Sequence, residues 1–96
     1  MIPVARLVAR IKLLPTDIKV NLDSVVNKLK SSLPDGMEIK NSAKEPIAFG
    51  LDALIVDFLL DDKEGQMDKL ESMVKDTEGV SEIQVMNISR QSSSLG

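Results

Sequence analysis

Few side chains in this sequence could do covalent chemistry, because the chain contains no cysteine and no histidine. Their absence excludes disulfides, thiolate zinc sites, cysteine or histidine nucleophile systems and imidazole general bases. Carboxylates and lysines remain, and on a small protein such groups usually only solvate the surface. Most familiar catalytic constellations are therefore closed to this chain.

Length and charge narrow the class of protein further. A chain of 96 residues predicts one domain, and its net charge of −3 argues against nucleic acid as the main ligand. No apolar run approaches the roughly 20 residues of a membrane helix, and the start at Met1 lacks the features of a signal peptide. We therefore expect a single-domain cytoplasmic protein that binds neither nucleic acid nor a membrane.

Period-two alternation from Val4 to Leu14 predicts a half-buried strand, which Pro15 ends. Its second face is mixed and basic, with Arg6, Arg10 and Lys12. Its first face is apolar and is expected to meet the helices; it consists of Ala5, Leu7, Ala9, Ile11 and Leu13.

Apolar residues at helical spacing predict two helices. The first begins after the N-cap Asn21 and stops before the turn 34–36. The second is expected to close at Glu78-Gly79, with Gly79 in the left-handed C-cap position. The apolar stripes are Leu22, Val25, Val26, Leu29 and Leu33 in the first helix, and Met67, Leu70, Met73, Val74 and Thr77 in the second.

Three further strands complete the pattern. Residues 37–44 are polar, as is typical of an edge strand, and residues 51–60 are apolar on both faces, as is typical of a central one. Residues 80–90 are predicted to form the fourth strand, and 91–96 are expected to form a flexible tail. In the second strand, one face is Met37, Ile39, Asn41 and Ala43. In the third strand, Leu54, Val56, Phe58 and Leu60 should face the helices, and Ile55, Asp57 and Leu59 the open side.

The resulting order, β-α-β-β-α-β, predicts a ferredoxin-like α+β fold over residues 1–90. Its antiparallel four-stranded sheet should have the strand order 4-1-3-2, with two helices on one face. We expect Asp57 to be an ion-pair partner among the cations of the open face.

The connection between the second and third strands contains a distinctive segment, Glu45-Pro46-Ile47-Ala48-Phe49-Gly50-Leu51. Pro46 restricts the backbone and Gly50 permits a turn, so Phe49 should be displayed at one end of the sheet. On the residues alone, a structural bend whose phenylalanine caps the core is the favoured interpretation.

This segment closely resembles the same connection in the exchange domain of elongation factor 1-beta, of the compact archaeal type. The resemblance covers roughly Val4 to Arg90. The proline after the first strand, the Pro-Asp-Gly turn, the Asp-Asp after the third strand and the Glu-Gly-Val before the fourth all fall where the family has them.

The resemblance implies guanine nucleotide exchange on the GTPase elongation factor 1-alpha, without enzyme activity and without a cofactor. It implies that Pro46, Ile47, Phe49 and Gly50 contact the partner. In eukaryotic members a lysine near the end of the last strand reaches the Mg²⁺ site of the GTPase, and here that position is Arg90. A guanidinium is larger and planar, so it does not simply replace an ammonium group. That Arg90 is only an exposed cation at a strand end is equally open.

Two points stay open at this level. Arg6, Arg10 and Lys12 are secondary candidates for contact with an acidic partner surface. The alternative function is a small-molecule-sensing or oligomerising module that associates through Ile55 and Leu59. For the exchange function we expect a monomeric, bare exchange domain.

Overall fold

The computed structural model describes residues 6–91, which form four strands and two helices. The elements are β1 (Arg6–Pro15), α1 (Leu22–Ser32), β2 (Met37–Ala48), β3 (Leu51–Asp61), α2 (Gln66–Lys75) and β4 (Val80–Gln91). Of the residues predicted to begin the first strand, Val4 and Ala5 lie outside the described range. The proposed tail also lies outside it, apart from Gln91, which ends β4.

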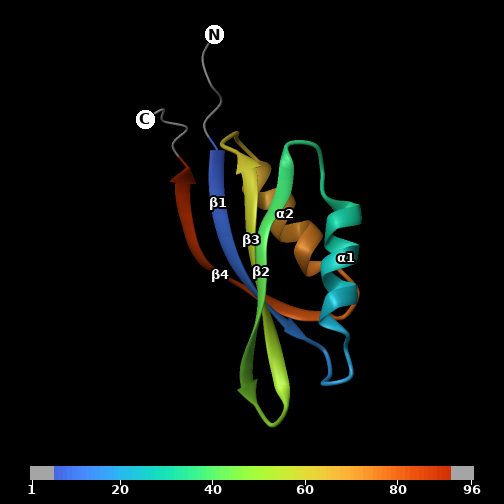
Figure 1. The fold of residues 1–96 in the computed structure, drawn as a ribbon. Helices are drawn as coiled ribbons and strands as arrows, with labels where there is room; N and C mark the ends of the chain where they lie inside the picture. The colour runs from blue at the N-terminus through green and yellow to red at the C-terminus, as the bar shows by residue number, and fades with distance from the viewer. Residues whose placement is uncertain (1–5, 92–96) are drawn as a thin grey trace.

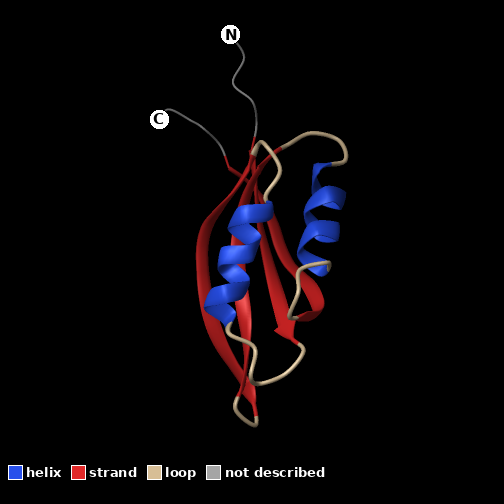
Figure 2. Ribbon diagram, turned by 90° about the vertical axis from the view of Figure 1, so that its right-hand side faces the viewer, coloured by secondary structure: helices blue, strands red, loops and turns tan. Residues whose placement is uncertain are grey.

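The four strands form one antiparallel sheet in the order β2-β3-β1-β4. Both helices cover the same face of this sheet (Figures 1 and 2). Read from the other edge, the strand order is 4-1-3-2, so the predicted ferredoxin-like α+β fold is confirmed. The two central strands are β1 and β3, as the predicted strand order required and as the apolar sequence of residues 51–60 predicted for β3.

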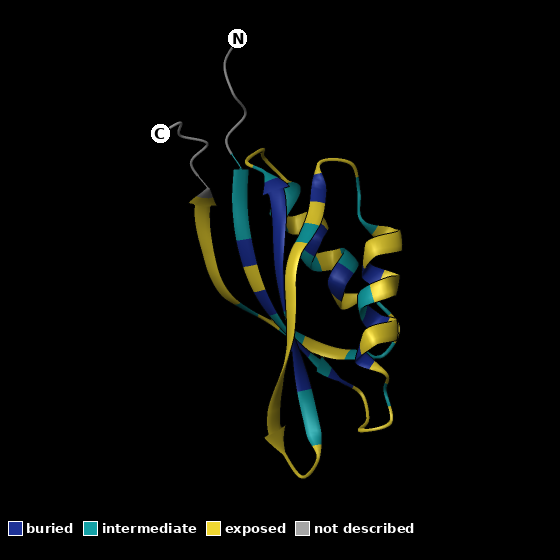
Figure 3. Cartoon of the chain, in the orientation of Figure 1, coloured by how far each residue is buried: buried dark blue, intermediate teal, exposed yellow. Residues whose placement is uncertain are grey.

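The core lies between the helices and the central strands, where the buried residues gather (Figure 3). The predicted helix-facing residues of β3 are all buried, and so are Ala9, Ile11 and Leu13 of β1. Leu7 packs against this core while partly exposed. The core contains one aromatic residue, Phe58. Most of the hydrophobic stabilisation of the fold therefore comes from burial of aliphatic side chains.

The N-cap prediction for α1 is confirmed. The Asn21 side chain accepts hydrogen bonds from the backbone amides of Asp23 and Ser24, at 2.9 and 3.2 Å. These bonds satisfy donors that the first helical turn cannot pair internally.

Among the described residues, no helix is long and apolar enough to cross a membrane.

The C-cap prediction for α2 is wrong. The helix ends at Lys75, and Gly79 lies in the turn before β4 with φ +94°. No glycine is needed at the helix end, because the amide of Asp76 and the hydroxyl of Thr77 donate to its last carbonyl groups. Gly79 instead permits a close approach, since a Cβ there would lie 3.2 Å from Val20 Cγ1.

β2 departs from the prediction in length and in facing. It continues to Ala48, beyond the predicted end at Lys44. A bulge between Ile39 and Asn41 inserts one residue against β3, so the side-chain alternation reverses there. Met37 and Ile39 therefore face the helices, whereas Asn41 and Ala43 lie on the open face, contrary to the prediction that all four share one side.

Candidate partner-binding sites

A tight hairpin joins β2 to β3 at one end of the sheet. Ala48 pairs with Leu51, which leaves Phe49 and Gly50 as a two-residue turn. Their φ angles are +53° and +78°, and two positive φ angles are typical of the type I′ turn of β-hairpins. The predicted connection 45–51 is therefore mostly strand, because the ladder continues almost to the turn.

The side chain of Phe49 is 100% exposed at the tip of this hairpin. Phe49 is also the one non-glycine residue with positive φ within residues 6–91. The left-handed conformation costs an ordinary residue about 1–2 kcal/mol, and full exposure returns no burial energy. The display of Phe49 at the sheet end is thus confirmed, and the alternative in which it caps the core is excluded.

The other three hairpin residues predicted to contact a partner surround Phe49. Pro46 lies on the outer strand, where a missing amide donor is tolerated, and Ile47 is an exposed residue at a register shift. A Cβ on Gly50 would meet nothing within 4 Å, so the space around this position does not call for glycine. Its positive φ does, because side chains disfavour that backbone conformation. The structure brings all four together in one exposed patch, the hairpin tip (Pro46, Ile47, Phe49 and Gly50).

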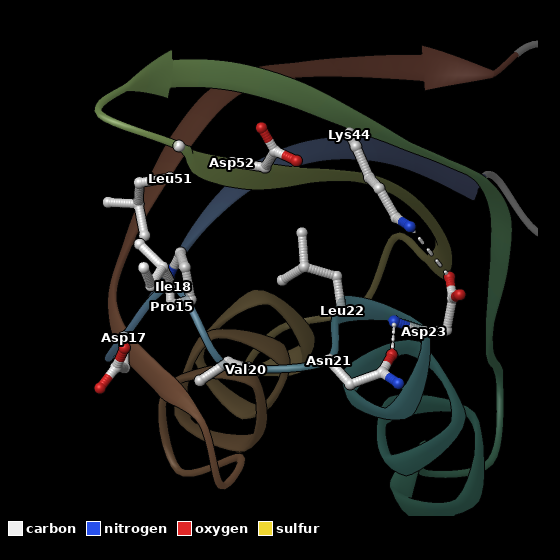
Figure 4. A pocket seen from close by; sticks show the side chains of 11 residues that line it. Pro15, Asp17, Ile18, Val20, Asn21, Leu22, Asp23, Lys44, Leu51 and Asp52 are labelled. Carbon is white, nitrogen blue, oxygen red and sulfur yellow. Dashed lines mark hydrogen bonds and ion pairs between the residues drawn. The ribbon is translucent and has the colours of Figure 1, made fainter.

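A residue that sequence reasoning missed lies near this tip. Ile18, in the loop between β1 and α1, is 62% exposed. It lines a pocket of about 300 Å³ together with Gly50 and Leu51 (Figure 4). An isoleucine between the charged residues Asp17 and Lys19 was the available signal. The polar groups of this pocket include structural ones: Lys44 Nζ lies 3.5 Å from Asp23 Oδ1, which links β2 to α1.

Arg90 is the second-last residue of β4, and β4 ends at the opposite end of the sheet from the β2–β3 hairpin (Figure 1). The register pairs it with Leu7, near the start of β1. Its side chain is 70% exposed, and Nη2 donates a 2.9 Å hydrogen bond to Asp62 Oδ2. β3, with 11 residues, links the two ends, and at about 3.3 Å per residue it spans roughly 35 Å. The structure therefore does not bring Arg90 and Phe49 into one site.

The open face of the sheet carries a row of internal ion pairs. Arg10 binds Asp57 through two hydrogen bonds, Nε to Oδ1 at 2.8 Å and Nη2 to Oδ2 at 3.1 Å. The Arg10 hydrogen bond lowers the pKa of Asp57, and burial opposes this effect. The predicted pairing of Asp57 is confirmed.

The other two cations, Arg6 and Lys12, form looser ion pairs without a hydrogen bond. Arg6 Nε lies 3.4 Å from Asp61 Oδ1, and Lys12 Nζ lies 3.6 Å from Glu45 Oε1. Each cation that sequence reasoning offered to an acidic partner thus already has a carboxylate neighbour within the chain.

The open face also carries the apolar residues Ile55 and Leu59 of β3, which are largely covered. Leu59 is 8% exposed, and Ile55 is partly exposed. Self-association through both residues, as in the alternative function, therefore finds little free apolar surface.

Within residues 6–91, no cluster of three or more acidic side chains is arranged to hold a metal ion.

Comparison with known proteins decides the family. The model of the EF-1 guanine nucleotide exchange domain matches residues 8–90. The chain belongs to this exchange family. The matched range contains the whole hairpin tip and ends at Arg90, so both candidate sites of this exchange-family chain lie within it.

Curated relatives agree along nearly their full length. Elongation factor 1-beta of Aeropyrum pernix is 39% identical over 87 residues, covering 90% of this chain and 97% of the relative. The Staphylothermus marinus protein is 40% identical with the same coverage. The Ignicoccus hospitalis protein is 36% identical over 93 residues, which are 96% of this chain and 99% of the relative.

A solved structure shares the fold of this exchange-family chain. The C-terminal domain of the MgtC protein from Mycobacterium tuberculosis superposes with a TM-score of 0.52. The match covers 92% of this chain and 88% of that domain, at 10% sequence identity. Such low identity supports the architecture alone, because this fold carries many unrelated functions.

Proposed function

We propose that this protein is a guanine nucleotide exchange factor for elongation factor 1-alpha in translation elongation. The family match over residues 8–90 carries the proposal. The protein is not an enzyme in the covalent sense. It binds the nucleotide-free GTPase more tightly than the nucleotide-bound form, and by linkage it must weaken nucleotide binding by the same factor.

In this proposal the two ends of the sheet have different tasks. The hairpin tip docks on the GTPase, with Phe49 as its main contact; its full exposure in a strained backbone conformation supports this role. Arg90 acts from the other end, where its charge disturbs the Mg²⁺ site that helps the GTPase hold its nucleotide. The exposed position of Arg90 at the end of β4 supports access to a partner.

We further propose that the protein acts as a monomer in the cytoplasm, where translation elongation takes place. The net charge of −3 and the ion-paired open face favour a protein partner over nucleic acid. The covered position of Leu59 favours a monomer.

The test is release of fluorescent GDP from purified elongation factor 1-alpha, with and without this protein at micromolar concentration. We expect faster release with the protein, and an unchanged rate would overturn the proposal. A homodimer that leaves the rate unchanged would favour the regulatory module instead.

Within this assay, Arg90→Ala should slow release about tenfold, as expected for loss of an interface hot spot. Lys30→Ala is the matched control, because it removes an exposed cation from α1, which packs beside β2 at the opposite edge of the sheet from β4. If Arg90→Ala matches the control, the exchange mechanism does not pass through Arg90.

A further inference from the structure

The end of the sheet that carries Arg90 also carries two consecutive carboxylates, Asp61 and Asp62. We propose that Asp62 is a positioning residue for Arg90, which holds the guanidinium ready for the GTPase before the two proteins meet. This inference rests on the proposed function, and it assigns a task to the Asp-Asp pair after the third strand.

Each of the two carboxylates serves a different arginine. Asp61 Oδ1 lies 3.4 Å from Arg6 Nε, and Asp62 Oδ2 accepts a hydrogen bond from Arg90 Nη2 at 2.9 Å. Asp61 is also confined, since a Cβ on Gly36 would lie 2.8 Å from its Oδ2. Asp61 is therefore committed to the packing at this end of the sheet, which leaves Asp62 to hold Arg90.

The way in which Asp62 holds Arg90 leaves the guanidinium usable. A guanidinium has five N–H donors, and within residues 6–91 Arg90 donates one hydrogen bond, from Nη2. The Arg10–Asp57 pair is different, because Nε and Nη2 both donate to the same carboxylate. Arg10 therefore uses two of its nitrogen atoms on one carboxylate. Arg90 is held by one hydrogen bond, and its other N–H donors remain available to a partner.

Tethering helps exchange because an arginine loses rotamer freedom when it docks. A side chain that is already restrained loses less of that freedom on binding. The pair is exposed, so its contribution is modest. We expect a two- to fivefold effect on exchange, which corresponds to about 0.4–1 kcal/mol.

The experiment measures GDP release from elongation factor 1-alpha at sub-saturating concentrations of the full chain. Asp62→Asn should lower the second-order rate constant two- to fivefold, and Asp62→Glu, which restores the carboxylate, should recover most of the loss. Glu64→Gln is the matched control, since it removes an exposed carboxylate from the same loop. Unfolding in urea should show equal stability for all these variants.

A double-mutant cycle provides a readout that a general structural role would not change. In the Arg90→Ala background, Asp62→Asn should have no further effect. An equal loss in both backgrounds would overturn the inference, and so would an Asp62→Asn protein that is as fast as the wild type or faster.

The outcomes separate the inference from the function on which it rests. If the wild-type protein does not accelerate release, both fail. If the wild type accelerates release but Arg90→Ala is silent, the exchange function stands and the role of Asp62 falls. If Arg90→Ala slows release and Asp62→Asn does not, only the positioning role is lost.

Discussion

At position 49 the backbone has a conformation that suits asparagine, yet the chain carries phenylalanine. Both turn residues have positive φ, and Asn-Gly is the preferred pair for such a turn. The Phe49 ring gains nothing from burial, because it is fully exposed. A residue that lowers stability and packs against nothing within the described chain supports the proposed contact of Phe49 with a partner.

This conflict predicts that Phe49→Asn separates stability from function. The variant should melt about 4 °C higher, because asparagine adopts the left-handed conformation more readily. It should also slow nucleotide exchange about tenfold, because the docking ring is gone. Thermal unfolding by circular dichroism and the GDP release assay measure the two effects. A variant that melts lower, or one that exchanges normally, would contradict the assignment of Phe49.

Residue-level features were predictable from sequence where the cause was local. Pro46 and Gly50 bracket Phe49 and indicated a bend at the end of the sheet, but it took the resemblance to the exchange family to favour a displayed ring over one that caps the core. The pairing of Arg90 with Asp62 was not predictable, because it joins segments that are distant in sequence and adjacent in the fold. The same is true of the pocket that Ile18 shares with Gly50 and Leu51.

Among the elements, β1 does more than fill the centre of the sheet. Its cations pair with carboxylates of β2 and β3, and these pairs bridge three strands on the open face. Most such pairs are exposed and contribute little. The Arg10–Asp57 pair is the strongest candidate for a measurable effect, since Asp57 is buried and bound through both carboxylate oxygens.

The pair predicts an acid-dependent part of the stability. The pKa of Asp57 is lowered in the folded state, so the pair stabilises the fold above the unfolded pKa of about 3.9 and loses that effect as pH falls through the folded value. Asp57→Asn should therefore lower the melting temperature by about 5 °C at pH 7 and less at pH 3. Melting curves across that range test it, with Asp35→Asn as an exposed control. Equal losses at both pH values would contradict the prediction.

The elements themselves were largely predictable, because their periodicity is strong and Asn21 and the turn 34–36 mark the ends of α1 and the start of β2. The exceptions have local causes. The bulge after Ile39 adds one residue that no period-two pattern reveals, and it exchanges the two faces of β2 beyond that point. α2 ends early because backbone and threonine donors satisfy its last carbonyl groups.

The whole molecule is elongated, with principal extents of 50 × 24 × 18 Å. The β2–β3 hairpin and the end of β4, which carries Arg90, lie at opposite ends of the sheet (Figure 1). The sheet between them is continuous through β3 and β1. The element order predicted this topology, but the separation of the two sites became clear only when the strand lengths and register were known.

This separation predicts that the two sites contribute independently. Residues far apart with no shared contacts usually have additive free-energy effects. The exchange defect of the double variant Phe49→Asn/Arg90→Ala should therefore equal the product of the two single defects, within about twofold. GDP release rates of the four proteins give the answer. A double variant no slower than the worse single variant would mean that the two ends act as one unit.

The exposed ring at the hairpin tip also has an optical consequence. The chain contains no tryptophan and no tyrosine, so it is nearly silent in intrinsic fluorescence. A tryptophan in place of Phe49 would be the sole indole of the protein, fully in water at the turn between β2 and β3. Its emission would shift to the blue only when a second surface covers it, so position 49 offers a place for a docking reporter with no background from the protein's other residues.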